Sequence, residues 1–483
     1  MNRYKLPVFL VCFLLLLALP AALVAAEEAE HELGRELPVW SVLPFVGMLL
    51  SIAIFPLLRP HWWEKHLLQV AIFWSAVFLI PFAFGFGPAE AVYELLEIVL
   101  LDYLPFIVLL WGLFAVAGGI ALRGSLAGSP RVNLVLLLIG TLLASWVGTT
   151  GASMLLIRPV IRANKWRRKK THIIVFFIFL VSNIGGSLTP LGDPPLFLGF
   201  LRGVPFLWTM KLLPLLVLNA VILLAALFIM DTVLYKKELA EGRRPDAGEK
   251  EPLSVKGLHN LIFLALIIFA VILSGTVPSL PFFADQVTGE AHGLPIYAGI
   301  VLPFSSILQM LLIIIAGCLS VVTTNKAYRE LNHFTWGPIK EVASLFIGIF
   351  ITMIPALAIL NARGGELGLV QPWQFFWATG ALSSFLDNAP TYLVFLTTAG
   401  SLGAAEGLST AVGVVGEQIL LAISAGAVFM GANTYIGNAP NFMVRSIAEE
   451  NEIKMPSFFG YMGWSLCCLI PLFIIDTFVF FLR

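Results

Sequence analysis

Two short polar segments interrupt apolar stretches of this 483-residue chain, and both have the same pattern. The first runs from Gly186 to Pro195 and the second from Gly431 to Pro440. Each fits G-x-x-T-x-x-G-[DN]-x-P, so that five positions out of ten are fixed. Because agreement at five fixed places is hard to obtain by chance, the two segments indicate a duplicated unit.

The composition of these segments suits the binding of small ions. Glycine and proline inside an apolar span remove hydrogen bonds from a helix and free backbone carbonyls and amides. Freed carbonyls can coordinate a cation, and freed amides at the N-terminus of a half-helix favour an anion. Side chains that add oxygen ligands of the kind Na⁺ takes are Asn183, Thr189, Asp193, Asn433, Thr434 and Asn438. The alternative is that glycine and proline only kink these helices and that each threonine bonds to its own turn.

Each segment follows another interrupted apolar stretch, the first at 132–161 and the second at 373–398. Thr149 lies 44 residues before Asp193, and Asn388 lies 50 residues before Asn438. A duplicated unit explains this repeated order. The small polar residues of interest in the two interruptions are Thr149, Thr150 and Ser153 in the first and Asp387, Asn388 and Thr391 in the second.

Asp387 is the side chain to which we give most weight. An ionised carboxylate in an apolar stretch is costly, and such groups usually mark the path of an ion or a proton. Burial favours the protonated carboxyl and a bound cation favours the ionised one, so a proton and Na⁺ would compete for it. Asp387 could also cap the helix that follows it, and capping and ligation can coexist. The residues predicted to bind Na⁺ are Asp193, Asp387, Asn388 and Asn438.

The composition points to a membrane protein. Hydrophobic residues make up 59% of the chain and charged residues only 12%, against about 25% charged in soluble domains. Stretches of about 20 apolar residues, long enough to cross a bilayer, recur along it. The formal net charge is zero and the basic residues form short clusters, so we expect no nucleic-acid partner. No HExxH, GxSxG or P-loop pattern occurs, so we expect neither an enzyme nor a bound cofactor.

The basic clusters also predict the topology. Basic residues flank the stretch 132–161 on both sides, so both of its ends are predicted to be cytoplasmic and the stretch to be a re-entrant hairpin. The stretch 373–398 would enter from the outside, and one hairpin from each face is typical of an inverted repeat. The predicted fold is therefore all-α and polytopic, with two re-entrant helical hairpins and two broken transmembrane helices, at 172–200 and 419–447.

The domain organisation follows from the same pattern. Residues 1–26 have the features of a signal peptide or a first span. The first inverted repeat is predicted at 39–231, a hydrophilic cytoplasmic linker at 232–257 and the second repeat at 258–483. We expect one span at 105–121, after an acidic outer loop, and another at 295–322. The charged residues expected near span ends, at the membrane interface, are Arg158, His172, Asp231 and Asp476.

The two hairpins and two broken spans resemble those of the ion-transporter superfamily, which includes NhaD-type sodium/proton antiporters, arsenite carriers and citrate or dicarboxylate carriers. The run from Ser384 to Pro390 resembles the Asp-Asn-x-Pro hairpin of the antiporter branch. The tips Thr149-Thr150-Gly151 and Asp387-Asn388-Ala389 differ from the Ser-Asn-Thr hairpins of dicarboxylate carriers. Related sequences are nevertheless often labelled citrate carriers.

The resemblance implies a homodimer in the inner (plasma) membrane, in which a mobile transport domain moves like an elevator against a scaffold domain. The predicted function is sodium/proton antiport, with Na⁺ and H⁺ as coupling ions. The alternative is cation-coupled uptake of an organic anion such as citrate or a dicarboxylate.

Overall fold

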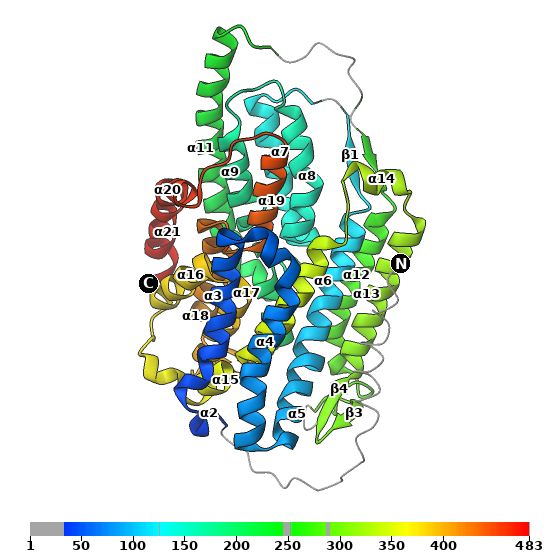
Figure 1. Cartoon of the computed structure of the whole chain (residues 1–483), viewed down its shortest axis with the longest axis vertical. Helices are drawn as coiled ribbons and strands as arrows, with labels where there is room; N and C mark the ends of the chain where they lie inside the picture. Colours follow the sequence, from blue (N-terminus) through cyan, green and yellow to red (C-terminus); the bar gives the residue numbers. More distant parts are fainter. Residues whose placement is uncertain (1–32, 125, 245–251, 253, 286–289, 483) are drawn as a thin grey trace. The chain divides into compact units, whose positions relative to one another are not determined.

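The computed structural model describes residues 33–482 except 125, 245–251, 253 and 286–289. The predicted signal segment at 1–26 lies outside the described residues. From Leu33 onward the chain forms one compact unit. Figure 1 shows it as a bundle of helices with a few short strands.

The first half combines long helices with several short ones. Its helices are α2 (Leu33–Glu36), η1 (Val39–Val42), α3 (Leu43–Leu58), α4 (Pro60–Phe86), α5 (Pro88–Glu97), the π-helix η2 (Ile98–Tyr103), α6 (Leu104–Ala117), α7 (Pro130–Val147), α8 (Thr149–Ala163), α9 (Thr171–Leu180), η3 (Ile184–Ser187), α10 (Pro194–Leu201), η4 (Phe206–Leu212) and α11 (Leu213–Ala240). Many of them begin with a proline in the first two positions, where its missing N–H is not needed.

The second half is built from similar elements. Its helices are α12 (Asn260–Thr276), η5 (Val277–Ser279), α13 (Phe304–Thr323), α14 (Lys326–Leu331), α15 (Gly337–Arg363), η6 (Gly364–Leu367), α16 (Pro372–Phe385), α17 (Asn388–Gly400), α18 (Glu417–Met430), η7 (Gly431–Asn433), α19 (Ala439–Glu450), α20 (Phe458–Cys468), α21 (Ile470–Asp476) and the π-helix η8 (Thr477–Phe481).

Six short strands form three antiparallel pairs within the described residues: β1 (Ala121–Arg123) with β2 (Ser254–Lys256), β3 (Gly293–Tyr297) with β4 (Ile300–Pro303), and β5 (Leu408–Thr410) with β6 (Gly413–Val415). The first pair ties the loop after α6 to the start of the second half.

Nine helical segments in the described ranges are long and apolar enough to cross a membrane. They are Val39–Pro56, Lys65–Phe86, Pro88–Ala117, Pro130–Val147, Phe206–Ala240, Asn260–Ser279, Phe304–Thr323, Gly337–Leu367 and Phe458–Phe481. Large apolar side chains such as Phe84, Val322 and Phe459 are exposed on their outer surfaces. Lipid, not water, is the solvent that favours such exposure. The prediction of an all-α, polytopic membrane fold is therefore confirmed.

The interrupted stretches are broken close to the predicted places. Helices α7 and α8 meet at Gly148, whose φ of +79° suits glycine. The amide of Gly128 donates to the carbonyl of Ala163 at 2.7 Å, so the far ends of the two helices lie together. In the second half, α16 ends at Phe385 and α17 begins at Asn388. Whether these turns lie at membrane depth stays a prediction.

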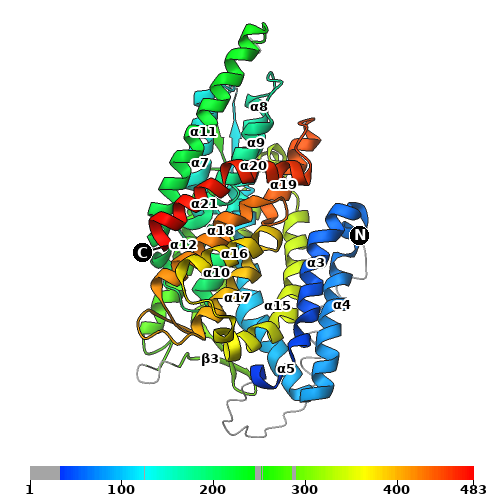
Figure 2. The same cartoon turned by 90° about the vertical axis from the view of Figure 1, so that its left-hand side faces the viewer.

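The helices pack in two groups, seen in Figures 1 and 2. Helices α6, α12 and α13 lie side by side in Figure 1, and α15 packs against α3 and α4, beside which it lies in Figure 2. The other group contains the broken stretches, with α7 against α8 and α11, α10 against α17, and α16 against α18. Helix α15 also contacts α17, so the two groups share an interface.

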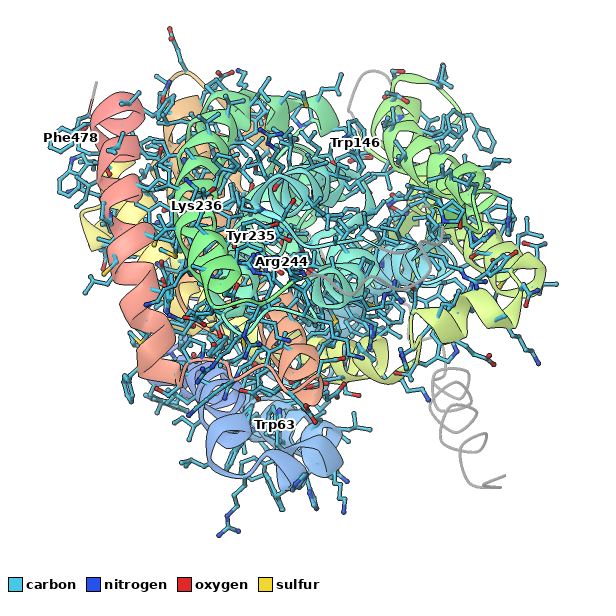
Figure 3. All side chains as sticks on the ribbon, turned by 90° about the horizontal axis from the view of Figure 1, so that it is seen from above. Trp63, Trp146, Tyr235, Lys236, Arg244 and Phe478 are labelled. Carbon is cyan, nitrogen blue, oxygen red and sulfur yellow. The ribbon has the colours of Figure 1, made fainter. Side chains whose placement is uncertain are left out.

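Figure 3 looks along the bundle from the end at which α11 finishes. The labelled side chains of Tyr235, Lys236 and Arg244 lie together near that end of α11, whereas Phe478 lies at the edge of the bundle. Phe478 is exposed, as a lipid-facing side chain would be. Helix α11 continues to Ala240, so the helical structure enters the segment predicted as a linker at 232–257.

Two expectations about the spans are wrong. The expected acidic loop before residue 105 is helical, because α5 and η2 continue into α6. Its buried carboxylate, Asp102, is held by an ion pair of 2.6 Å with Arg202. The expected span at 295–322 begins only at Phe304. The preceding residues form the β3–β4 hairpin, in which Pro295 and Gly299 disfavour a helix.

Candidate functional site

Asp193 is the centre of a polar cluster inside the bundle. It precedes α10 and is only 1% exposed. Its Oδ1 accepts hydrogen bonds from Thr149 Oγ1 at 2.9 Å and from Asn438 Nδ2 at 3.1 Å. Its Oδ2 accepts one from Asn388 Nδ2 at 2.5 Å. No Lys, Arg or His pairs with this carboxylate among the described residues.

The backbone around Asp193 also favours negative charge. Four helices begin at or next to the cluster: α8 at Thr149, α10 at Pro194, α17 at Asn388 and α19 at Ala439. The N-terminus of a helix carries a partial positive charge. These helices exist as separate half-helices because the intervening segments, with their glycines and prolines, do not continue the helical hydrogen bonds. The breaks therefore create a polar pocket that a continuous helix would not have.

Asp387 lies on the wall of a small cavity of about 70 Å³ beside this cluster. It is the N-cap of α17, and one of its carboxylate oxygens accepts from the amide of Ala389 at 3.1 Å. The expected capping role is thus present, and the side chain still faces the cavity. Asn388, the residue after Asp387, donates to Asp193, so the two acidic residues belong to the same cluster.

The small cavity has one polar wall and one apolar wall. Thr149, Thr150, Asp387 and Asn438 line the polar side, and α6 and α15 supply the apolar side. Asp193 lies directly behind the polar wall, since both of its chain neighbours line the cavity. The cluster therefore adjoins a space large enough for an ion or a few water molecules.

Two amide oxygens of the cluster lack a donor. Asn388 Oδ1 and Asn433 Oδ1 are buried without a hydrogen-bond partner. A buried acceptor left unpaired is costly, and a bound cation would remove that cost. Asn388 belongs to the cluster through its bond to Asp193, so its Oδ1 and the carboxylates of Asp193 and Asp387 are hard ligands of the kind that a small cation takes.

The same contacts recur in the two halves. Thr189 Oγ1 donates to the carbonyl of Ser145, and Thr434 Oγ1 donates to the carbonyl of Ser384. The chain separations of these pairs are 44 and 50 residues, the same as those from Thr149 to Asp193 and from 388 to 438. Each threonine of the motif thus holds its broken segment against the tip of the preceding helical pair.

The glycines of the motif also have a repeated role. A Cβ added to Gly192 would collide with the carbonyl oxygen of Gly186. A Cβ added to Gly437 would collide with the carbonyl oxygen of Gly431. The two glycines of each motif are therefore fixed by their close approach to each other, which explains their place in the pattern.

The remaining predicted residues lie around the cluster with distinct partners. Asn183 Oδ1 accepts from Asn438 Nδ2 at 3.2 Å, which joins the two broken segments. Asn433 Nδ2 donates to Ser384 Oγ at 2.9 Å. Thr391 bonds back to the carbonyl of Asp387 at 3.0 Å, which is a turn-closing role. Ser153 bonds to Ser182 at 2.9 Å and does not contact Asp193.

Sequence reasoning missed three structural members of the cluster. Asn183 Nδ2 donates to Asn441 Oδ1 at 2.7 Å, and Asn441 in turn donates to the carbonyl of Gly431 at 2.8 Å. Asn441 has no counterpart in the first motif, where Leu196 stands, so the repeat could not reveal it. Ser145 and Ser384 could have been found, because they precede the two motif threonines at the repeated separations.

A larger cavity of about 620 Å³ adjoins the small one. The two cavities share Pro338, and α8 and α19 line both of them. The larger cavity lies toward the ends of α8 and α19 that carry Arg162 and Glu450. These ends are predicted to be cytoplasmic, so the two cavities would form a route from that side to the polar cluster.

In a bundle of membrane-spanning helices, a buried carboxylate without a cationic partner usually marks the path of an ion or a proton. Residues 34–481 match the family described as "Putative citrate transport", and the chain belongs to this family. It is accordingly a multi-pass membrane protein of a transporter family, as its resemblance to citrate carriers and ion transporters indicated. No curated protein matches the chain.

Proposed function

We propose that the protein is a secondary transporter that exchanges Na⁺ for H⁺ at Asp193 and Asp387. The observation that carries this proposal is the Asp193 carboxylate, which is buried, held by three neutral donors and not paired with any described cationic side chain. The small cavity beside it is lined by an acid and by no Lys, Arg or His. Such a site favours a cation over an anion.

The exchange follows from the two forms of the carboxyl group. Na⁺ binds to the ionised form, so binding of Na⁺ releases a proton from Asp193. When a proton binds to Asp193 again, it removes the negative charge that holds Na⁺. Repulsion between Asp193 and Asp387 makes the empty, doubly ionised site unfavourable. The amide of Asn388 can bond to Asp193 in both of its forms. Its Nδ2 donates to the ionised carboxylate, and after a half-turn of the amide its unpaired Oδ1 could accept from the protonated carboxyl.

We further propose that the two halves are inverted repeats and that the helical pairs α7–α8 and α16–α17 are re-entrant hairpins. The recurrence of the same threonine-to-serine-carbonyl contact in both halves supports the repeat. The small cavity lies between the broken stretches and α6 with α15, and the larger one lies between α8, α19 and the start of α15. A sliding movement at that interface, as in an elevator, would carry Asp193 between the two sides. The homodimer and the inner-membrane location stay predictions.

The second candidate is cation-coupled transport of citrate or another organic anion. It is supported by the family match and by the four helix N-termini around the cluster, whose amides favour a carboxylate. In that case Na⁺ or H⁺ at Asp193 would accompany the anion in the same direction.

One preparation in proteoliposomes distinguishes the two candidates. For antiport, a Na⁺ pulse should move protons in the opposite direction without any organic anion, and labelled citrate should not accumulate. A Na⁺ pulse that moves no protons, together with citrate uptake that depends on a gradient, would favour the second candidate instead.

The variant Asp387→Asn tests the role of the second carboxylate. It should abolish transport while the protein remains in the membrane, because the amide keeps the cap acceptor but loses the charge. The exposed Glu241→Gln, beyond the end of α11, is the matched control and should transport normally. Wild-type rates in Asp387→Asn would refute this role.

A further inference from the structure

The larger cavity differs in charge from the small one. Its ionisable lining consists of Arg158 and Arg162 from α8, Glu450 from α19 and His333, with Thr335, Ser446 and Asn451 as neutral hydrogen-bonding groups. Guanidinium groups therefore outnumber carboxylates there, whereas the small cavity has a carboxylate and no cation. The volume of about 620 Å³ is within the range of small-molecule sites, roughly 300–1,000 Å³.

Arg158 is the group in this cavity that lacks a partner. Its Nη1 is buried and donates no hydrogen bond. Arg162, one turn further along α8, donates through Nη2 to the carbonyl of Leu122 at 2.9 Å and is thus already engaged. The expectation that Arg158 extends to the membrane interface does not account for a buried N–H without an acceptor, since such a group is costly.

Glu450 is not the missing hydrogen-bond acceptor for Arg158. Its charge acts on Arg158 through space, but no ion pair joins the two side chains. Glu450 is exposed, so water screens its charge. An acceptor from outside the chain can therefore approach Arg158 through the open side of the cavity.

We propose that the larger cavity binds a small oxyanion with two or more negative charges, a polycarboxylate or a phosphate, with Arg158 as its principal ligand. The planar guanidinium offers two parallel N–H groups that match a carboxylate or phosphate. Arg162, Thr335 and Ser446 surround the same space and supply further positive charge and donors.

This site is separate from the ion site at Asp193. Arg158 is eight positions after Thr150, which lines the small cavity, and this corresponds to about 12 Å along α8. An occupant at Arg158 would stand between α8 and α19, on the route from the predicted cytoplasmic side to the small cavity. Bound oxyanion should therefore slow transport from that side without being transported.

Binding is measured directly on the purified full-length protein, by calorimetry at constant ionic strength with citrate, inorganic phosphate or chloride. Citrate or phosphate should bind and chloride should not. The oxyanion that binds more tightly identifies the chemical class of the natural ligand. Arg158→Gln should weaken binding at least about tenfold, since a charged hydrogen bond is lost. Glu450→Gln should strengthen it, because the opposing charge is removed.

Two further variants make the result decisive. Arg158→Lys keeps the charge without the fork and should bind with intermediate affinity, which covers the case that Arg158→Gln does not fold. Arg243→Gln, at an exposed position three residues beyond the end of α11, is the control and should bind like the wild type. Asp193→Asn should retain oxyanion binding even if it abolishes transport.

The proposal is overturned if Arg158→Gln and Arg158→Lys both bind like the wild type. It is also overturned if Asp193→Asn abolishes oxyanion binding and the arginine variants do not, because the anion would then occupy the central site. Failure of sodium/proton exchange in proteoliposomes would refute the proposed function but would leave this binding result unaffected.

Discussion

At the scale of single residues, the position of negative charge in the site is set by an asymmetry between two similar segments. The first motif has Asp193 where the second has Asn438, and the two side chains are joined by a hydrogen bond of 3.1 Å. A carboxylate at position 438 instead of 193 would therefore lie only about 3 Å, the length of one hydrogen bond, from its present place. Exchanging the two residues tests whether transport needs only a carboxylate in the site or needs it at position 193.

We expect Asp193→Asn to abolish Na⁺-dependent proton movement, since the only fully buried carboxylate of the cluster is lost. The double variant Asp193→Asn with Asn438→Asp should recover part of the activity, because one carboxylate and one amide again face each other. Proton release on a Na⁺ pulse measures both. A single Asp193→Asn variant that retains full activity would contradict the role of this carboxylate.

At the scale of elements, the motif glycines should be needed for the helical breaks to pack. We expect Gly192→Ala and Gly437→Ala to lose stability and transport, because the new methyl group meets backbone that cannot move aside easily. Gly463→Ala in α20 is the control, since nothing lies within 4 Å of the added carbon. It should be neutral or slightly stabilising. Thermal unfolding in detergent, combined with transport, measures the difference.

A second feature at the scale of elements is a buried ion-pair network that connects helices. Arg167 Nη1 lies 2.5 Å from Asp231 Oδ1, and Arg167 Nε lies 2.9 Å from Glu238 Oε2. His172 Nε2 also contacts Asp231 at 2.9 Å. The network joins α9 and α11 to the loop after α8, and it is buried in protein, whereas the sequence placed His172 and Asp231 at the membrane interface.

Removal of one partner from this network should be strongly destabilising. Arg167→Met leaves two buried carboxylates without their cation, and we expect a loss of about 3–5 kcal/mol. The matched control is Lys211→Met, which breaks an ion pair of 2.5 Å whose side chains are about half exposed, at 49% and 52%. That change should be worth less than about 1 kcal/mol. Equal effects on thermal unfolding would contradict the comparison.

The sequence predicted the broken elements well because glycine and proline act locally. The stretch predicted at 132–161 is observed as Pro130–Val147 and Thr149–Ala163, and the turn falls at Gly148. The partners of the predicted residues were harder to obtain, because they come from distant parts of the chain. Asn441 and the burial of Asp102 depend on tertiary contacts with Asn183 and Arg202, which leave no local pattern.

At the scale of the whole molecule, the two cavities predict access from one side. A cysteine at Thr335, on the larger cavity, should react with an impermeant thiol reagent from the predicted cytoplasmic side. A cysteine at the exposed Ala89, near the start of α5, should react from the other side. Both would be made in a chain whose native cysteines are replaced. Labelling of both positions from the same side would contradict the predicted topology.

The three donors to Asp193 have a consequence for the way the chain is made. Asn388 and Asn438 follow Asp193 by 195 and 245 residues, so a ribosome needs roughly 10–50 s to reach them at 5–20 residues per second. During this interval the nascent first half carries an acid whose only completed partner is Thr149. We expect Asp193 to enter the bilayer as the neutral acid and to ionise only after synthesis of the second half is complete, so that ion binding begins as the last step of assembly.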